Sequence, residues 1–421
     1  MQTRTKIRID SWAGRTLVFF LNLAARLLGK ILRPDHSLTK APGKIVVCKF
    51  LGMGSIIQST PLLQTLRANF PNAKIFFVTS PANTTLMKSV SAVDETLYID
   101  DSSFGHVFSS SLRLLRRLWK EKIDLYIDLE TYSYFSTAIA TMSCARNRMG
   151  FYRVERNIRL GVYTHMMFFN ARAPIAQSYL QMARLAGCRE IIDQLYSFPV
   201  SNEAFESFKR KLSEIKVAPT APYILINPNA SDLRIERRWP ASNFIALAEA
   251  LQQKFQQYQI FLIGSASEHA YVESVYAGIN TERRNRIFNT AGLFNLEELF
   301  ALVRGSSLMI TNDTGPMHIS FSFRRPTVAL FGPASPDQYG QNDYAFGFYK
   351  NIYCSPCVHD FLTPPCRGDN QCMKKIAPQE VLDLCIQILD KQLKQQHSVN
   401  ETGIDFLKND HHSVLGVVER N

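Results

Sequence analysis

Strand-like and helix-like patterns alternate along most of this chain. Short apolar runs rich in β-branched residues, such as residues 44–50 and 74–79, are each followed by a helical pattern, and the alternation starts again at residue 223. Strands that are separated by helices pair in parallel, with the helices covering both faces of the sheet. The sequence therefore predicts an α/β fold of doubly wound, Rossmann-like parallel sheets.

The length of the chain predicts two such domains. At 421 residues it exceeds the size that one hydrophobic core usually supports. Its 46% hydrophobic and 20% charged residues are typical of a globular protein. The polar stretch 202–220 is the expected linker region. We expect a membrane-associated amphipathic helix over residues 1–40, one Rossmann-like domain over 41–200, a second over 201–396, and a loose tail over 397–421.

The first 40 residues carry half of the net charge of the chain. They hold eight basic and two acidic side chains, and the whole chain has a net charge of +12. The longest charge-free run, between Arg15 and Arg26, has ten residues, whereas a membrane-crossing helix needs about 20. Arg15, Asn22 and Arg26 share one helical face and apolar side chains cover the rest. This pattern is typical of a helix in the headgroup layer with its basic residues toward anionic lipid.

Three other interpretations of this segment stay open. It could be an uncleaved signal segment, although no small-residue cleavage site follows it. It could pack on the protein's own surface, or it could span the membrane with snorkelling arginines. Because it precedes the break at Ala41-Pro42-Gly43 and belongs to neither sheet, we expect that its removal leaves the protein folded.

The segment from Thr311 to His318 joins an expected strand to an expected short helix. Backbone N–H groups at a helix start, together with the helix dipole, favour an anion such as a phosphate. Pro316 suits the first turn of a helix, where its missing N–H would have no partner. Asp313 and His318 add a carboxylate for hydroxyl groups and a titratable ring. The alternative is an ordinary helix cap made by Asp313 or Thr314.

Four segments, in the same order along the chain, resemble glycosyltransferase family 9, the heptosyltransferase family of lipopolysaccharide core assembly. The segments are Phe50-Leu51-Gly52-Met53-Gly54-Ser55, Ile226-Asn227-Pro228-Asn229-Ala230 with Arg238-Trp239-Pro240, Leu262-Ile263-Gly264 with Glu268 and Thr290-Ala291-Gly292, and Asn312-Asp313-Thr314-Gly315-Pro316-Met317-His318 with Phe331-Gly332-Pro333. The resemblance implies the GT-B fold, in which two Rossmann-like domains face a cleft. It also implies a nucleotide-activated heptose donor, typically ADP-heptose, and no catalytic metal.

The resemblance also implies roles for single residues. Asp313, Thr314 and Gly315 would hold the diphosphate and the sugar, with His318 beside them. Arg238 would neutralise the diphosphate leaving group. The remaining donor-binding residues by resemblance are Glu268 at the ribose, Leu293 at the adenine, Gly54 and Asn229.

The chain departs from the family at the expected general base. The family's glycine loop ends in Gly-Asp, and here it ends in Gly54-Ser55. A serine hydroxyl is no base at neutral pH without an activator. We expect Glu130 to accept the proton, with Asp128 as second candidate, because both follow a predicted strand at the edge where open α/β sheets bind ligands. For Asp128 the alternative is a strand-end or cap role.

Arginines are concentrated between residues 146 and 159. The run contains Arg146, Arg148, Arg153, Arg156 and Arg159. It is either a solvated basic loop or a clamp on an anionic, lipid-linked acceptor, for which we name Arg146, Arg148 and Arg153. Nucleic acid is not expected as a partner, because no recognised nucleic-acid-binding module accompanies the arginines.

Four of the eight cysteines have a spacing that suits a metal. Cys354, Cys357, Cys366 and Cys372 form a C-x2-C-x8-C-x5-C pattern. Four thiolates can complete a tetrahedral zinc or iron site, which would be structural because no position stays open for substrate. Two disulfides or unpaired thiols are the alternatives.

Together these features predict an inverting glycosyltransferase that moves a heptose-type sugar onto the lipopolysaccharide core or another envelope glycolipid. It would be a peripheral protein of the cytoplasmic face of the bacterial inner membrane. A protein (autotransporter) heptosyltransferase and a catalytically weak sugar-nucleotide-binding scaffold are the alternatives, the second because Ser55 replaces the usual base.

Overall fold

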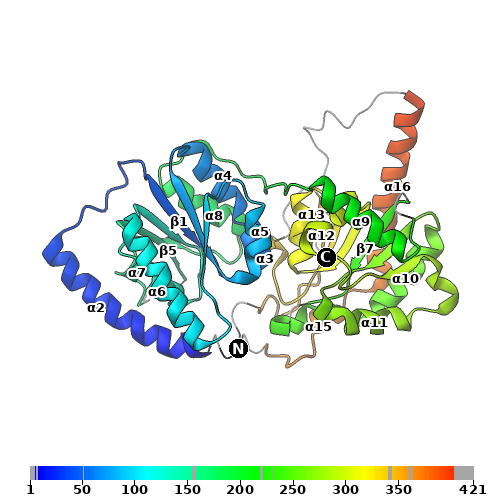
Figure 1. Cartoon of the computed structure of the whole chain (residues 1–421). Helices are drawn as coiled ribbons and strands as arrows, with labels where there is room; N and C mark the ends of the chain where they lie inside the picture. Colours follow the sequence, from blue (N-terminus) through cyan, green and yellow to red (C-terminus); the bar gives the residue numbers. More distant parts are fainter. Residues whose placement is uncertain are drawn as a thin grey trace. The chain divides into compact units, whose positions relative to one another are not determined.

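The computed structural model describes residues 5, 8–50, 52–153, 158–218, 221–230, 232–339, 344–358, 361 and 364–402. The chain divides into two compact units, residues 1–199 and residues 200–421 (Figure 1). Each unit is built around its own six-stranded sheet.

The N-terminal unit contains a parallel sheet with strand order β3-β2-β1-β4-β5-β6. Its strands are β1 Lys44–Cys48, β2 Lys74–Thr79, β3 Glu95–Tyr98, β4 Leu125–Asp128, β5 Asn147–Tyr152 and β6 His165–Phe168. In the register of the central strands, Val46 pairs with Phe76 on one side and with Tyr126 on the other. All three are fully buried, as expected for strands that helices cover on both faces.

Helices cover both faces of this sheet. On one face lie α6 Phe104–Glu121 and α7 Tyr134–Met142, and on the other lie the mutually packed α4 Thr60–Asn69 and α8 Ile175–Leu185 (Figure 1). The shorter helices are η1 Asp10–Gly14, α3 Met53–Ile57, η2 Pro81–Asn83 and α5 Thr84–Lys88. The serines before α6 and α7 cap them, since Ser103 accepts from the His106 N–H and Ser133 from the Ser136 N–H.

The C-terminal unit repeats this architecture with strand order β12-β11-β10-β7-β8-β9. Its strands are β7 Tyr223–Asn227, β8 Gln259–Leu262, β9 Ile287–Asn289, β10 Leu308–Asn312, β11 Thr327–Phe331 and β12 Ala345–Tyr349. Its helices are α9 Asn202–Glu214, η3 Asp232–Arg237, α10 Ala241–Lys254, η4 Ala266–Glu268, α11 His269–Gly278, η5 Thr281–Arg286, α12 Leu296–Gly305, α13 Gly315–Ser322, α14 Pro336–Tyr339, α15 Gln371–Lys374 and α16 Pro378–Thr402. The predicted doubly wound α/β fold is confirmed, because every strand pair in both sheets is parallel.

The expectation of a linker over residues 202–220 was wrong. This stretch forms α9, which buries Phe208 and Leu212. Its polar surface hid a narrow apolar face, and such a face is enough to dock a helix. The predicted loose tail, residues 397–421, starts within α16, which continues to Thr402, and its residues 403–421 lie outside the described part of the chain.

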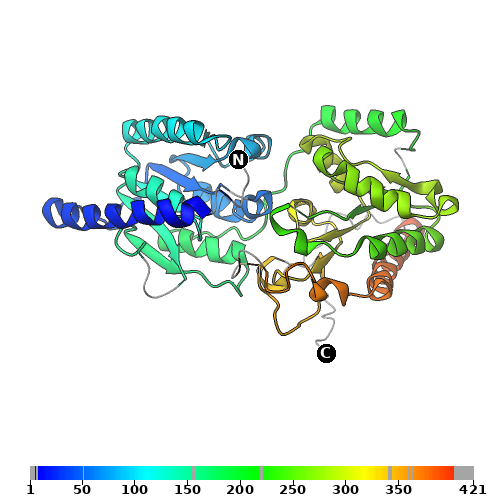
Figure 2. The same cartoon turned by 90° about the horizontal axis from the view of Figure 1, so that it is seen from below.

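The helix α2, Arg15–Leu32, packs on the N-terminal unit. Figure 2 shows it lying lengthwise on the outside of this unit. Val18 and Asn22 are buried against α7 and the segment around Ile158, so this side of the helix packs on the protein's own surface. Asn22, which was expected to face lipid headgroups, therefore faces protein, whereas large apolar side chains of α2 are exposed. Among the described residues no helix is both long and apolar enough to cross a membrane.

Candidate functional site

Glu130 lies at the carboxyl edge of the N-terminal sheet, just beyond the end of β4. Its Oε1 accepts a hydrogen bond from the Phe50 N–H at 2.8 Å, and its Oε2 lies 2.9 Å from the Lys49 ammonium. Lys49 and Phe50 follow β1, the neighbouring strand, so the parallel register brings these three residues together. The carboxylate is held at the edge where open α/β sheets bind their ligands.

The Asp128 side chain points into the protein and forms hydrogen bonds with groups at the carboxyl edge of the sheet. Its Oδ1 accepts from the Glu130 N–H at 2.9 Å, and its Oδ2 accepts from Ser136 Oγ at 2.8 Å and from the Tyr163 hydroxyl. The side chain is fully buried, and burial raises its pKa. We therefore correct the catalytic prediction for Asp128, because its carboxylate is used inside the protein to position Glu130.

The glycine loop lies at the same edge. Gly52 has φ +84° and precedes α3, in which Gly54 is buried and Ser55 is half-buried. Gly54 thus belongs to the N-terminal unit, whereas the other residues predicted to bind the donor belong to the C-terminal unit.

The predicted acceptor arginines lie at two opposite edges of the sheet. Arg146 and Arg148 lie at the amino end of β5, where Arg146 pairs with Asp35 at 2.7 Å and Arg148 donates to the carbonyls of Val162 and Ala145. Both arginines bond groups of this protein and lie at the amino ends of the strands, opposite the edge that carries Glu130. We therefore correct the prediction that Arg146 and Arg148 bind the acceptor. Arg153 follows the carboxyl end of β5, and its guanidinium lies 4.8 Å from the Tyr132 ring centroid.

Arg159 supports the Glu130 loop from behind. Its Nη1 donates to the Thr131 carbonyl at 2.6 Å, and its Nη2 donates to the Glu130 carbonyl at 2.8 Å. The side chain is buried, so it is no part of a solvated basic loop. Arg156 of the same run lies outside the described residues.

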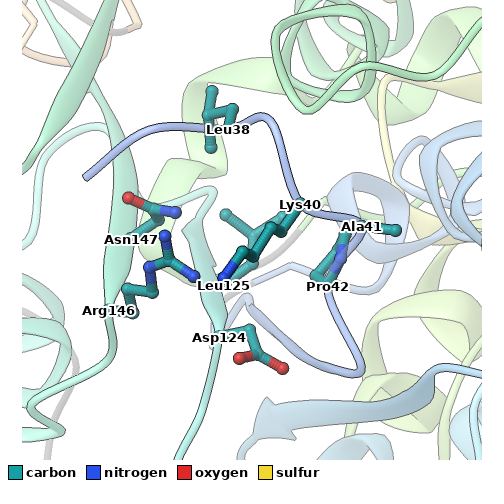
Figure 3. Close-up of a pocket in the computed structure, with 8 residues that line it drawn as sticks. All are labelled: Leu38, Lys40, Ala41, Pro42, Asp124, Leu125, Arg146 and Asn147. Carbon is teal, nitrogen blue, oxygen red and sulfur yellow. The ribbon is translucent and has the colours of Figure 1, made fainter. Parts of the chain in front are cut away.

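A small cavity opens at the amino ends of the strands of the N-terminal unit (Figure 3). Its lining residues are Leu38, Lys40, Ala41, Pro42, Asp124, Leu125, Arg146 and Asn147. The Asp124 carboxylate accepts from the N–H groups of Gly43 and Lys44, each at 2.9 Å. Because the cavity lies at the edge opposite Glu130, it is no part of the candidate site.

The N-terminal segment makes two contacts with the elements that support Glu130. Asp10 accepts hydrogen bonds from the N–H groups of Tyr134 at 3.0 Å and Phe135 at 2.6 Å, which start α7. Burial raises the pKa of Asp10, and the charge of Glu130 raises it further. Asn22 Nδ2 donates to the carbonyls of Ile158 and Leu160, on either side of Arg159. The N-terminal segment therefore contacts both α7 and the Arg159 loop, the two elements that support Glu130.

The C-terminal unit has a candidate site of its own around the start of α13. Asp313 is buried beside Arg237, whose Nε lies 3.4 Å from Asp313 Oδ2. Within the described part of the chain, neither of these two atoms makes a hydrogen bond. Burial raises the pKa of Asp313, and the charge of Arg237 opposes the rise. Arg237 is partly buried, and its Nη1 donates to the Asp313 carbonyl at 3.3 Å. The unsatisfied Nε and Oδ2 atoms are typical of groups that a ligand completes.

A network of asparagines shapes this helix start. Asn227, at the end of β7, donates to Thr311 Oγ1 at 3.0 Å and to Thr314 Oγ1 at 2.8 Å. Thr314 precedes α13 but makes no side-chain capping bond to it. The cap predicted as the alternative is therefore absent for Thr314, and the first turn of the helix can receive an anion.

Asn312 and Asn229 hold the neighbouring loops. Asn312 Nδ2 donates to the carbonyls of Pro228 and Asn229, and its Oδ1 accepts from the Trp239 N–H at 3.1 Å. Asn229 Oδ1 is buried and has no hydrogen-bond partner among the described residues. A Cβ at Gly264 would lie 2.8 Å from Asn229 Nδ2, so only glycine permits this close approach.

His318 is buried within α13 and is neutral at physiological pH. Burial and the charge of Arg237 lower its pKa to about 3. Its ring packs against Phe321 and Tyr339. It can therefore serve as a neutral hydrogen-bonding group but supplies no positive charge to a phosphate.

Arg237, which the sequence reasoning missed, is the arginine that pairs with Asp313. The guanidinium of Arg238, the residue predicted from sequence, lies 3.8 Å from the Tyr271 ring centroid. The sequence feature that could have pointed to Arg237 is the arginine pair Arg237-Arg238 before Trp239. A sequence does not tell, however, which of two adjacent side chains faces the start of α13.

The residues expected at the nucleoside lie on two adjoining loops. Glu268 closes a capping box on the Ser265 N–H at 2.8 Å, and the Leu293 carbonyl accepts from Lys211 at 2.9 Å. Gly292 has φ +78°, and a Cβ there would lie 3.0 Å from Ala266 Cα. This contact brings the loops after β8 and β9 together, so Glu268 and Leu293 can line one nucleoside site.

Two of the four cysteines lie beside Gly332 and Pro333, since the Cys357 N–H donates to the Pro333 carbonyl at 2.9 Å and Cys372 Sγ lies 3.0 Å from where a Cβ at Gly332 would be. Burial raises the pKa of Cys357 and Cys372 to about 11, and the charges of Cys354 and Cys366 add to this rise. The four do not form a ligand set, because no three His, Cys, Asp or Glu side chains within the described ranges are arranged to hold a metal. All eight cysteines are free, which excludes the two disulfides in this structure.

Sequence comparisons point to one family. The family model described as Glycosyltransferase family 9 (heptosyltransferase) matches residues 111–363. The chain is 26% identical over 297 residues to lipopolysaccharide heptosyltransferase 2 of Salmonella typhimurium, covering 70% of this chain and 84% of that protein. It is 25% identical over 320 residues to lipopolysaccharide heptosyltransferase 1 of Campylobacter coli, covering 73% and 87%.

Solved structures share the fold. A glycosyl transferase family 9 protein of Veillonella parvula matches with a TM-score of 0.70 at 22% identity, covering 84% of this chain and 100% of that one. The ADP-heptose lps heptosyltransferase II of E. coli matches with a TM-score of 0.65 at 24% identity, covering 83% and 99%. The predicted GT-B fold is confirmed by these matches.

Proposed function

The chain belongs to glycosyltransferase family 9, and on this premise we propose that it transfers a heptose-type sugar from ADP-heptose to the lipopolysaccharide core or another envelope glycolipid. The observation that carries the proposal is the start of α13, where buried polar atoms of Arg237, Asp313 and Asn229 have no hydrogen-bond partner in the described part of the chain. These three side chains and the helix start suit a diphosphate sugar, because they combine a cation and a helix N-terminus for the phosphates with oxygen atoms that accept hydrogen bonds from sugar hydroxyls.

In this proposal the C-terminal unit holds the donor. Arg237 and the first N–H groups of α13 meet the diphosphate and stabilise the charge that develops on it as it leaves. The Asp313 carboxylate accepts from sugar hydroxyls. Glu268 and Leu293 bind the ribose and the adenine. Neutral His318 adds a hydrogen bond without changing the charge of the site.

Glu130 is the proposed general base. The acceptor oxygen forms its bond to the anomeric carbon as the bond from that carbon to the diphosphate oxygen breaks, which inverts the configuration. The hydroxyl proton passes to the Glu130 carboxylate, and the nucleoside diphosphate leaves as an anion. Lys49 and the Phe50 N–H hold the carboxylate in place for this step. Arg153 is the acceptor-binding arginine that we retain.

The relatives reported above favour a glycolipid acceptor over a protein acceptor, since both are lipopolysaccharide heptosyltransferases. The intact donor site argues against a catalytically weak scaffold. We propose that the protein works at the cytoplasmic face of the inner membrane, because η1 exposes Trp12 and α2 exposes Phe20 and Ile31.

We also retain a structural zinc or iron ion at Cys354, Cys357, Cys366 and Cys372 as a proposal. The spacing of the four cysteines in the sequence supports it, although their side chains form no ligand set among the described residues. A metal would require thiolates and would therefore have to lower the raised thiol pKa values.

The function is tested with labelled ADP-heptose and a heptose-accepting lipopolysaccharide core precursor in detergent. The native protein should transfer label to the glycolipid, and Glu130→Gln should lower kcat by about 10²–10⁴-fold with unchanged donor affinity. Ser55→Ala is the matched control and should have a much smaller effect. Transfer of label to protein instead of glycolipid would refute the acceptor, and normal turnover of Glu130→Gln would refute the base.

A further inference from the structure

The helix α6 carries an exposed apolar stripe that the proposed function does not use. Phe104, Phe108 and Trp119 are 57%, 73% and 46% exposed. Their spacings of 4 and 11 residues place them on one helical face, since 11 residues make about three turns. The stripe is interrupted, because Ser111 and Leu115 on the same face are buried between Phe108 and Trp119. Even so, three exposed aromatic side chains on one helix are more than the scattered apolar residues of an ordinary surface.

The contacts of α6 show which way this stripe faces. Trp119 Nε1 donates to the Met142 carbonyl at the end of α7, at 2.7 Å. On the opposite flank of α6, Arg117 pairs with Glu95 of β3 at 3.0 Å. The stripe therefore lies on the flank toward α7.

The helix α7 separates this stripe from α2. It contacts both α2 and α6 and lies between them in Figure 1. None of its nine residues is exposed, so α2 and α6 form the outer surface on either side of it. Along α2 the exposed apolar side chains are Leu17, Phe19, Phe20, Leu23, Leu27, Leu28, Ile31 and Leu32. Both helices thus present apolar side chains on the same face of the N-terminal unit.

The charges beside these apolar side chains are mostly positive, with Asp100 and Asp101 just before α6 as acidic exceptions. Arg113, Arg116 and Lys120 are exposed on α6, whose only acidic residue, Glu121, is paired with Lys44 and Arg117. On α2 and directly after it, Arg15, Lys30 and Arg33 are exposed. Aromatic side chains among basic ones fit the boundary between headgroups and acyl chains of an anionic lipid layer.

We propose that α2 and α6 together form one membrane-docking surface whose partner is an anionic phospholipid monolayer. This inference rests on the membrane attachment proposed above and extends it to a second helix. Both helical segments begin at the carboxyl edge of the sheet, because α6 follows β3 and Asp10 caps α7 next to Glu130. Docking through both would hold that edge beside the headgroups, where a lipid-linked acceptor is presented.

Depth-dependent fluorescence quenching tests the insertion of α6 directly. The full-length Trp12→Phe variant keeps Trp119 and Trp239, and Trp239 is fully buried in the C-terminal core. Brominated lipids in vesicles that contain one third phosphatidylglycerol should therefore quench Trp119. Absence of quenching in vesicle-bound protein would overturn the proposal.

Vesicle co-sedimentation tests the energetics. The double variant Phe104→Ser/Phe108→Ser should weaken binding about tenfold or more. Each of Arg113→Gln, Arg116→Gln and Lys120→Gln should weaken it about fivefold at low salt. Phe205→Ser, at an exposed phenylalanine of the C-terminal unit, is the matched control and should bind normally. Thermal melting of each variant verifies the fold.

The outcomes separate this inference from the attachment through α2. Failure of the native protein to bind vesicles would refute both. Loss of binding in Phe20→Ser/Leu27→Ser with full binding in the α6 variants would refute only the two-helix surface. In that case the stripe on α6 would serve a protein partner instead.

Discussion

At the scale of single residues, the start of α13 distinguishes two adjacent arginines. Arg237→Gln should weaken ADP-heptose binding about tenfold to a hundredfold, because a charge-assisted contact contributes about 1.5–3 kcal/mol. Arg238→Gln should cost much less, because that guanidinium stacks on Tyr271. Calorimetric titration of both variants with ADP-heptose measures the difference. Equal losses would place both arginines on the diphosphate.

His318 gives a pH dependence of stability with a defined sign. Its pKa is lowered to about 3 in the folded protein, against about 6.5 in an unfolded chain. Between these values the unfolded state binds more protons, so this group's stabilisation is complete above about pH 6.5 and is lost as the pH falls, by roughly 1.4 kcal/mol per unit. Asp128 and Asp313, whose pKa values are raised, act in the opposite direction.

Comparison with a variant therefore isolates the histidine. Urea unfolding of the native protein and of His318→Asn, measured at pH 7 and pH 5, should show a smaller acid-induced loss of stability in the variant. Parallel losses in the two proteins would contradict the neutral, buried state of His318.

At the scale of helices, Asp10 joins the N-terminal segment to α7. Asp10→Ala removes the acceptor of two N–H groups at the start of that helix, so it should destabilise the protein by about 1 kcal/mol. It should also lower kcat with unchanged donor affinity, because α7 supplies Ser136 to the Asp128–Glu130 contact. Asp10→Asn keeps one acceptor and should recover part of both effects. An unchanged kcat in Asp10→Ala would show that the cap does not position Glu130.

The cysteine segment makes a prediction at the same scale. Elemental analysis of protein purified without added metal should find about one zinc or iron per chain, and Cys357→Ser should lower both metal content and thermal stability. Cys385→Ser is the control, since Cys385 is a buried cysteine of the same core cluster as Cys372 but lies outside the four-cysteine pattern, so its variant should keep the metal content. Native protein that contains neither metal and melts like Cys357→Ser would refute the site.

At the scale of the whole molecule, removal of residues 1–34 should release the protein from membranes and also destabilise it. The second effect corrects the expectation from sequence, because Val18 and Asn22 are buried against the N-terminal unit and Asp10 caps α7. Membrane fractionation and thermal melting of the truncated protein measure the two effects. A truncated protein that melts like the native one would show that α2 adds nothing to the fold.

Periodicity and ordered motifs are local properties of the chain, so they were enough to predict the parallel α/β architecture, the family and the strand-to-helix turn at residues 311–318. Three further facts became visible only in the folded chain: Arg237 pairs with Asp313, the Asp128 carboxylate bonds groups inside the protein, and Arg146 lies at the amino ends of the strands. The tertiary structure also decided which face of α2 is buried. These outcomes depend on side-chain contacts between residues far apart in sequence. Asp10 with Phe135 and Arg237 with Asp313 are two such pairs, and strand register and helix packing bring them together.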